Sequence, residues 1–308
     1  MRIPDTMRPI DVKRLFLFAS LFLVLFSSCF KEDSPEDPNG GDIEIPEGDY
    51  IQGKKERNLK SAWNQKLTAV HIHQSYAEVW RAFYTTDVRA DGYVADLYGG
   101  PTTNYKLGSD QQGTSLDPDS YNREHSFPKS WFGTKDQDYD LYTDLFNLYP
   151  SDATANSRRS NFPFGEIQGT ALWTNTYCKL GNMTAVGFSG KVFEPNDEIK
   201  GDLARTYFYI ATRYEKENFS SWGSSGAQLL TYSAYPFFKS WQLNLLLKWH
   251  RADPVSEKER KRNEAVKAIQ GNRNPYIDYP ELVEYIWGTL KEKPFYYIHT
   301  AQGKEIFN

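Results

Sequence analysis

Three short segments in the middle of the chain decide its fold: Arg123-Glu124-His125, Asp144-Leu145-Phe146-Asn147-Leu148-Tyr149-Pro150, and Asn156-Ser157-Arg158-Arg159-Ser160-Asn161. Pro128 disfavours helix in the residues just before it, so we expect the first segment to be extended. Residues 140–148 have the pattern of a second strand, which Pro150 ends, and Ser151 can cap a helix over residues 152–160. The segments together predict a small strand–loop–strand–helix unit.

Three side chains of this unit carry the groups that phosphodiester hydrolysis requires. Histidine has an ordinary pKa near neutrality, so His125 is the natural base to deprotonate water. Magnesium prefers oxygen ligands, which the carboxylate of Glu124 and the amide of Asn156 can provide. Glu124 and His125 are neighbours on an extended segment, and their side chains therefore point to opposite faces. They can flank one phosphate only if the strand twists or ends there.

The predicted helix also carries cations that could hold a phosphate in line. Hydrolysis needs positive charge to stabilise the negative charge that builds up at the phosphate. Asp152, Asn156 and Arg159 lie on one helical face, whereas Arg158 points elsewhere. Asn156 could therefore offer its amide oxygen to a metal while Arg159 contacts the same phosphate.

These segments resemble the bacterial endonuclease I family, which comprises nonspecific periplasmic and secreted nucleases of the ββα-metal (His-Me finger) superfamily. That family has Glu-His at the end of a strand, then Asn-Leu-x-Pro, then a helix with a metal-binding asparagine, and the spacing from Asn147 to Asn156 fits. Further matching segments follow in the same order: Phe193-Glu194-Pro195, Lys200-Gly201-Asp202, Ala204-Arg205, Gln270-Gly271-Asn272-Arg273-Asn274-Pro275 and Ile277-Asp278. The resemblance extends over most of the chain, from residue 59 to residue 288.

The resemblance implies a role for each residue of the site. His125 is the general base, and Glu124 and Asn156 bind one Mg²⁺, for which Mn²⁺ or Ca²⁺ could substitute. The substrates are DNA and, since no 2′-hydroxyl takes part, RNA as well, and the products carry 5′-phosphates. From the residues alone, Asn147 fits a turn residue that bonds the backbone better than a ligand. Asp144 could either orient the site or cap a turn.

The cation that contacts the phosphate is the least defined part of the site. Relatives in this family carry an arginine in the loop after Glu-His, but residues 126–146 contain none. Arg159 is therefore our candidate for a catalytic cation, with Lys129 as the second choice. Arg205 could line the nucleic-acid groove or equally pair with a buried acid such as Glu194. The residues predicted to bind nucleic acid are Lys129, Arg158, Arg159, Lys200 and Arg205.

The N-terminus has the pattern of an export signal. Lys13 and Arg14 precede an uncharged, mostly apolar run over residues 15–28, which is too short to span a bilayer comfortably. The run ends in Leu25-Phe26-Ser27-Ser28-Cys29, which resembles a bacterial lipobox and implies cleavage before Cys29 and acylation of its thiol. We expect a signal over residues 1–29, a flexible acidic tether over 30–52 and a catalytic domain over 53–308.

Export with lipidation would place the protein in the outer membrane or on the cell surface, with the lipid anchor as its membrane contact. A plain secreted protein is the alternative. The lipobox, the net charge of −4 and the aromatic content of 16% also fit a surface lipoprotein that binds nucleic acid or glycan without cleaving it. An acidic protein can still attract phosphates through a local basic groove.

The composition indicates a globular α+β protein. Hydrophobic residues make up 39% of the 308 residues and charged residues 25%, which excludes a wholly disordered chain. The two cysteines exclude a disulfide framework within the chain. Apolar residues at helical spacing recur over residues 55–84, 202–214, 228–249, 256–270 and 280–290, and residues 93–98 have the pattern of a short strand. We therefore expect a helix-rich single domain with the ββα unit at its centre.

Overall fold

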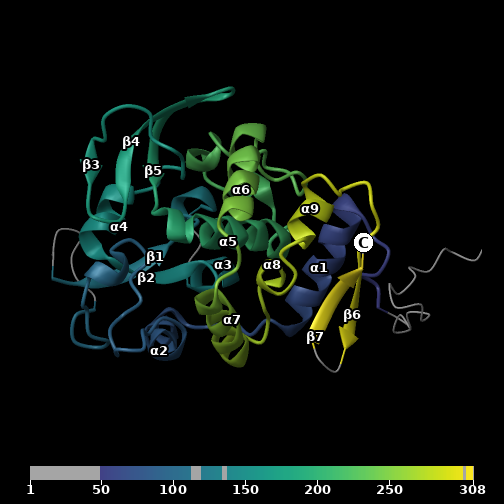
Figure 1. The fold of residues 1–308 in the computed structure, drawn as a ribbon, viewed down its shortest axis with the longest axis horizontal. Coiled ribbons are helices and arrows are strands. Elements are labelled where there is room, and N and C mark those ends of the chain that lie inside the picture. The colour runs from purple at the N-terminus through teal and green to yellow at the C-terminus, as the bar shows by residue number, and fades with distance from the viewer. Residues whose placement is uncertain (1–48, 112–118, 134–136, 301–302, 308) are drawn as a thin grey trace, which may run out of the picture. The chain divides into compact units, whose positions relative to one another are not determined.

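The helix α5 (Lys200–Arg213) runs through the middle of the fold and is buried along almost its whole length (Figure 1). The computed structural model describes residues 49–111, 119–133, 137–300 and 303–307. A helix that is enclosed on all sides belongs to the core, and α1 (Glu56–Val70) and α6 (Ser240–Ala252) both pack against α5. The prediction of a helix over residues 202–214 is confirmed, with a start two residues earlier.

Further helices surround this core. They are α2 (Tyr76–Thr86), α3 (Asp140–Thr143), α7 (Glu257–Gln270), α8 (Pro275–Asp278) and α9 (Leu282–Ile286). The helical pattern over residues 55–84 divides into α1 and α2, because Ser75 begins a new helix through a capping box with Glu78. Short 3₁₀ turns lie at Gly100–Thr102, Lys129–Trp131, Asp197–Ile199, Phe219–Ser221 and Ser224–Gly226.

The predicted strand–loop–strand–helix unit is present at the expected place in the chain. β1 (Tyr121–His125) pairs antiparallel with β2 (Leu148–Asp152), and α4 (Ala153–Arg159) follows directly. The predicted strand over residues 140–148 is wrong, because that segment forms α3 and a loop. Pro150 lies within β2 opposite Arg123, which a two-stranded sheet tolerates since both strands are edges. The cap of α4 is Asp152 rather than Ser151.

Two further sheets were not predicted. β3 (Trp173–Thr174), β4 (Lys179–Ala185) and β5 (Phe188–Glu194) form an antiparallel sheet in that order, and β6 (Tyr296–Thr300) pairs with β7 (Gly303–Phe307). The predicted strand over residues 93–98 has only isolated bridges, and the helix expected over 228–249 begins at Ser240. The class is nevertheless α+β and helix-rich, as predicted.

The N-terminal predictions fall outside the described residues. The signal over residues 1–29, the lipidation of Cys29 and the tether up to residue 48 stay predictions. The last tether residues belong to the folded part instead, since Ile51 is fully buried and Gln52 donates to the Tyr297 carbonyl oxygen at 2.6 Å. Within the described ranges, none of the helices combines the length and the apolar character needed to cross a membrane.

Candidate active site

The strand β1 presents its side chains to two faces and ends at the candidate site. Asn122 and Glu124 point to one face, and Arg123 and His125 to the other, because successive residues of a strand alternate. The strand ends after His125, where the Ser126 amide donates to the Asn147 carbonyl oxygen at 2.9 Å. Because the strand ends here, Glu124 and His125 meet the condition for flanking one phosphate although they point to opposite faces.

Glu124 lies almost completely buried, with 3% of its surface exposed. The Tyr98 hydroxyl donates to its Oε1 at 2.8 Å, and Nη1 of Arg159 lies 3.3 Å from the same oxygen. Burial raises the pKa of Glu124 to about 7, against the opposing effects of the Arg159 charge and the Tyr98 hydrogen bond. Oε2 accepts no side-chain hydrogen bond in the described part of the chain. Side chains thus hold Oε1, the His125 amide also hydrogen-bonds to the carboxylate, and Oε2 is the oxygen that could contact a ligand.

Asn156 is oriented by a second asparagine. Its Nδ2 donates to Oδ1 of Asn122 at 2.5 Å, so its Oδ1 is the atom left to face a cation. Asn122 lies two residues before Glu124 on the same face of β1, so Asn156 lies on the face of the strand that carries Glu124. One carboxylate and one amide oxygen are a donor set that Mg²⁺ accepts. Across the described residues, histidine, cysteine and acidic side chains form no cluster of three that could hold a metal, so these two oxygens would share the ion with water and phosphate.

His125 is held in one tautomer by the backbone. Its Nε2 lies 2.8 Å from the Tyr142 carbonyl oxygen, which can only accept, so Nε2 carries the proton and Nδ1 the lone pair. Burial, together with the charges of Lys129, Arg123 and Arg159, lowers the pKa of His125 to about 3, against the opposing effect of the hydrogen bond to the Tyr142 carbonyl oxygen. The imidazole is therefore neutral near pH 7 and has a proton acceptor at Nδ1.

Aromatic rings surround the imidazole. The Tyr76 ring stacks on His125 with its centre 6.1 Å away, and the Tyr142 ring meets it edge-on at 4.8 Å. Phe132 lies 6.4 Å from the imidazole. These rings fix the orientation of His125 and limit the access of water to it. Sequence reasoning identified neither these residues nor Tyr98 and Asn122, because each reaches the site from a distant part of the chain or through strand alternation.

Arg159 stabilises the site from the protein interior and is not placed to contact a substrate. Its side chain is completely buried, and its guanidinium donates to the carbonyl oxygens of His125 and Ser126 at 3.2 and 2.5 Å and to the Tyr207 hydroxyl at 3.3 Å. Its position beside Glu124 leaves it enclosed by protein. This burial contradicts the prediction that Arg159 contacts the phosphate, whether as a catalytic cation or as a nucleic-acid-binding residue.

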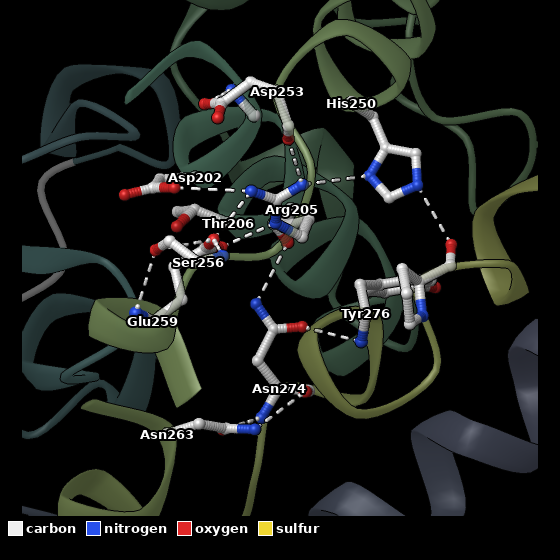
Figure 2. A network of polar contacts seen from close by, with 12 residues as sticks. Asp202, Arg205, Thr206, His250, Asp253, Ser256, Glu259, Asn263, Asn274 and Tyr276 are labelled. Atoms are coloured by element: carbon white, nitrogen blue, oxygen red, sulfur yellow. Dashed lines mark hydrogen bonds and ion pairs between the residues drawn. The ribbon is translucent and has the colours of Figure 1, made fainter. Parts of the chain in front are cut away.

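Arg205 is likewise a structural residue (Figure 2). Its guanidinium binds both carboxylate oxygens of Glu259, at 2.5 and 2.8 Å, and also contacts Asp202 at 3.3 Å and the Asp253 carbonyl oxygen at 2.8 Å. Because none of its surface is exposed, the prediction that Arg205 binds nucleic acid is wrong. The alternative prediction, that Arg205 pairs with a buried acid, is confirmed, but the acid is Glu259 and not Glu194.

The remaining predicted cations divide into paired and unpaired ones. Lys200 is buried, and its ammonium group lies 3.0 Å from Glu194 and 2.6 Å from Asp197, so its charge is already neutralised, against the prediction that it binds nucleic acid. Lys129 and Arg158 are exposed and form no ion pair with any described residue. These two remain candidates for contacts with a phosphate backbone.

Asp144 and the segment around Gln270 position the loop that leads into β2. The Asp144 carboxylate accepts hydrogen bonds from the hydroxyls of Tyr209 and Tyr214 at 2.7 and 2.8 Å and from Nε2 of Gln270 at 2.9 Å. Gln270 also accepts from the Leu145 amide at 2.9 Å. Asp144 combines the two roles considered for it: it anchors the loop before β2 to α5 and α7, and its Oδ1 also caps a turn by accepting from the Phe146 amide at 2.8 Å.

A cavity of about 440 Å³ opens near the ends of α2, α5 and α7. Its lining includes none of Glu124, His125 and Asn156. Two ion pairs lie in its lining, Lys258 with Asp202 at 2.9 Å and Arg262 with Asp87 at 2.8 Å. We therefore place the chemistry at the end of β1 and not in this cavity.

Known proteins match most of this chain. The family model for Endonuclease I matches residues 56–281. An extracellular ribonuclease of Bacillus subtilis (strain 168) is 36% identical over 245 residues, which cover 77% of this chain and 76% of the relative. An extracellular ribonuclease of Bacillus amyloliquefaciens is 35% identical over 247 residues, covering 76% and 75%. An extracellular deoxyribonuclease of Aeromonas hydrophila is 28% identical over 147 residues, covering 47% and 53%.

The family match covers every candidate active-site residue, from Tyr76 to Arg159. The relatives are named as nucleases, so the comparisons do not support the alternative of a lipoprotein that binds polymers without cleaving them. With the fold, the paired strands and the extended sequence match in agreement, the chain belongs to the endonuclease I family and is a nuclease that hydrolyses phosphodiester bonds.

Proposed function

We propose that this protein is a magnesium-dependent, sequence-nonspecific endonuclease with His125 as its general base and with Glu124 and Asn156 as its metal ligands. One observation carries the proposal. At the end of β1, a neutral histidine with a free Nδ1 follows directly after a carboxylate whose Oε2 accepts no side-chain hydrogen bond in the described part. The strand–strand–helix arrangement around them supports a site of the ββα-metal type.

The histidine is arranged to take one proton. Nδ1 of His125 accepts a proton from the attacking water, whose oxygen forms a bond to phosphorus while the bond from phosphorus to the 3′ oxygen breaks. The imidazolium that results is stabilised by the Tyr142 carbonyl oxygen, which already accepts from Nε2. Solvent supplies the proton of the 3′-hydroxyl, and the other product keeps the phosphate at its 5′ end.

The oxygens of Glu124 and Asn156 fit a divalent cation. When bound, Mg²⁺ supplies positive charge that stabilises the extra negative charge on the phosphate, and Mn²⁺ or Ca²⁺ could take its place. Tyr98 and Arg159 hold one oxygen of Glu124, while Asn122 holds the amide of Asn156. These partners keep the two ligand oxygens in place before the cation arrives.

Substrate range and location follow from the chemistry and the relatives. The proposed reaction uses no 2′-hydroxyl, so we expect cleavage of DNA and RNA, and the relatives include ribonucleases and deoxyribonucleases. Relatives named extracellular and periplasmic support export of this chain. We further propose a lipid anchor at Cys29 that places the protein in the outer membrane or on the cell surface.

The test of the proposed base is the variant His125→Ala. We expect it to fold normally and to lose cleavage by about 10²-fold or more, the usual contribution of a positioned general base. His73→Ala is the matched control, because His73 is an exposed histidine outside the site, paired with Asp140 at 3.0 Å. Full activity of His125→Ala would overturn the mechanism.

A further inference from the structure

Arg123 differs from the buried arginines because it has no carboxylate partner within the described ranges. Nitrogens of Arg159, Arg205, Arg213 and Arg262 lie 2.5–3.3 Å from a carboxylate oxygen. Arg123 is half-buried. A partly buried cation without an anion is costly for the free protein, and an anionic ligand would remove that cost.

The helix α2 holds the guanidinium of Arg123 in place. Its central carbon lies 3.3 Å from the centre of the Tyr76 ring and 4.5 Å from that of Trp80, and Nη1 donates to the Tyr76 carbonyl oxygen. Apart from the contact of the guanidinium with the Tyr76 side chain, Nε and Nη2 have no hydrogen-bond partner in the described part, and neither is among its enclosed polar atoms. The side chain is therefore fixed, yet two of its donors remain open to solvent.

This open guanidinium lies near the proposed base. Arg123 and His125 point to the same face of β1, and the Tyr76 ring contacts both of them. Two residues of a strand span about 7 Å, which is too far for both side chains to serve one phosphate oxygen. The separation is comparable to that between successive phosphates of an extended nucleic-acid strand.

We propose that Arg123 binds the phosphate next to the one that is cleaved, through Nε and Nη2, and thereby favours polynucleotides over small phosphodiesters. The inference rests on the proposed nuclease function and names one of its substrate contacts. A guanidinium can donate two parallel hydrogen bonds to two phosphate oxygens, which an ammonium group cannot do. Arg123 is thus a substrate-binding residue, whereas His125 performs the chemistry.

The competing explanation is purely structural. Stacking on Tyr76 and Trp80 could serve only to fasten α2 to β1. In that case the loss of Arg123 would disturb His125 through Tyr76 and would reduce the cleavage of every substrate equally. A phosphate contact instead affects long substrates and the dependence of their binding on salt.

The first measurement is binding of a labelled single-stranded DNA oligonucleotide in EDTA, by the His125→Ala protein with and without Arg123→Ala. We expect Arg123→Ala to raise Kd about tenfold, as for the loss of one charge-assisted hydrogen bond. The slope of log Kd against log salt should fall by about 0.7, the value for one phosphate contact on a single strand. The control is Arg260→Ala, which removes an exposed arginine of α7 without a described ion pair and should change neither quantity.

The second measurement compares substrates in the presence of magnesium. Arg123→Ala should raise KM for DNA about tenfold, a larger factor than the change in KM for bis(p-nitrophenyl) phosphate, and circular dichroism checks that the variant is folded. Arg123→Lys should restore part of the salt slope, since it keeps the charge without the planar fork.

Two results would overturn the assignment of Arg123. One is an equal loss on both substrates, and the other is a wild-type salt slope in Arg123→Ala. If the wild-type protein cleaved neither substrate, the proposed nuclease mechanism would fail, while the binding measurement would still decide on Arg123.

Discussion

The amide of Asn156 can serve a cation only if its oxygen, and not its NH₂ group, faces the ligand site. Asn122 determines this orientation by accepting the hydrogen bond from Nδ2 of Asn156. Partners that orient metal ligands are expected to matter nearly as much as the ligands themselves. Asn122 is therefore the residue at which the proposed metal site can be weakened without removing a ligand.

Asn122→Ala should weaken the apparent affinity for magnesium by roughly 10- to 100-fold, with cleavage restored towards wild type at high magnesium. The reason is that the Asn156 amide becomes free to rotate, although it is still present. The measurement is the rate of plasmid nicking over a magnesium series, with Asn182→Ala on the exposed side of β4 as the control. An unchanged magnesium dependence would exclude Asn122 from the site.

The candidate ligands and base could be predicted from the sequence, whereas their partners could not. Glu124, His125 and Asn156 stand at a spacing along the chain that resembles one family. Tyr98, Tyr142 and Asn122 reach these residues across 26, 17 and 34 positions, and no local pattern shows such contacts. These contacts can be identified only in the folded structure.

The cations were predicted less well, for a physical reason. The helical period correctly places Arg159 near Asn156, but it does not tell whether that face meets solvent or the core. In the structure it meets the core, and Arg159 binds the carbonyl oxygens at the end of β1. Arg123 received no role at all from the sequence, because its isolation from carboxylates is a property of the packing.

Asn147 joins the two loops that flank the strands of the ββα unit. Its side chain accepts from the Phe127 amide at 2.7 Å and donates to the carbonyl oxygens of Phe127 and Leu141 at 3.2 Å each. The prediction that Asn147 is a backbone-bonding residue rather than a ligand is confirmed. It is completely buried, so none of these backbone groups could turn to water if the side chain were removed.

Asn147→Ala should therefore lower the free energy of unfolding by about 3 kcal/mol, because buried backbone groups lose their partners. Urea denaturation followed by circular dichroism measures this change. Asn182→Ala again provides the comparison and should alter the unfolding free energy by less than about 0.5 kcal/mol. Equal stability of the two variants would show that the loop connection through Asn147 is unimportant.

The boundaries of elements were harder to predict than their order. Residues 140–148 alternate like a strand, yet Asp140–Thr143 forms α3, which brings the Tyr142 carbonyl oxygen to His125. Tertiary contacts decide that geometry, since Asp140 pairs with Arg213 of α5 at 2.8 Å. The helix α7, by contrast, was predicted closely, because Ser256 and Gly271 are local start and stop signals.

The helices α5, α6 and α7 meet in a buried polar network that contains His250 (Figure 2). Nε2 of His250 lies 3.0 Å from the Pro280 carbonyl oxygen, and Nδ1 lies 3.5 Å from Nη1 of Arg205. Burial, with the Arg205 charge, lowers the pKa of His250 to about 4 from 6.5. The folded protein therefore excludes a proton that the unfolded chain accepts between about pH 6.5 and pH 4.

This difference makes stability depend on pH. The contribution of neutral His250 is complete above about pH 6.5 and is lost as the pH falls to about 4, at a cost of about 3 kcal/mol. His250→Gln should remove the contribution of His250 to the pH dependence of the unfolding free energy. The unfolding free energy of this variant should therefore fall less than that of wild type between pH 7 and pH 4.5. Urea denaturation at both pH values measures the difference, and parallel pH dependences would contradict the assignment.

The molecule as a whole combines an acidic charge with a site for a polyanion. The net charge of −4 excludes a broadly basic surface. Lys200 and Arg205, which lie in segments that match the endonuclease I family, form ion pairs within the protein. Arg123, Lys129 and Arg158 are left without an ion pair among the described residues. Because so few cations face the substrate, we expect binding of nucleic acid to be weak and to depend only shallowly on salt concentration.

The most direct measurement is the cleavage of supercoiled plasmid by the purified protein, with magnesium and with EDTA, beside His125→Ala and His73→Ala. Wild type and His73→Ala should convert the plasmid to nicked and then fragmented DNA only when magnesium is present. His125→Ala should remain folded and leave the plasmid intact over the same time. Cleavage that persists in EDTA, or that His125→Ala carries out at the wild-type rate, would contradict a metal-dependent nuclease with His125 as its base.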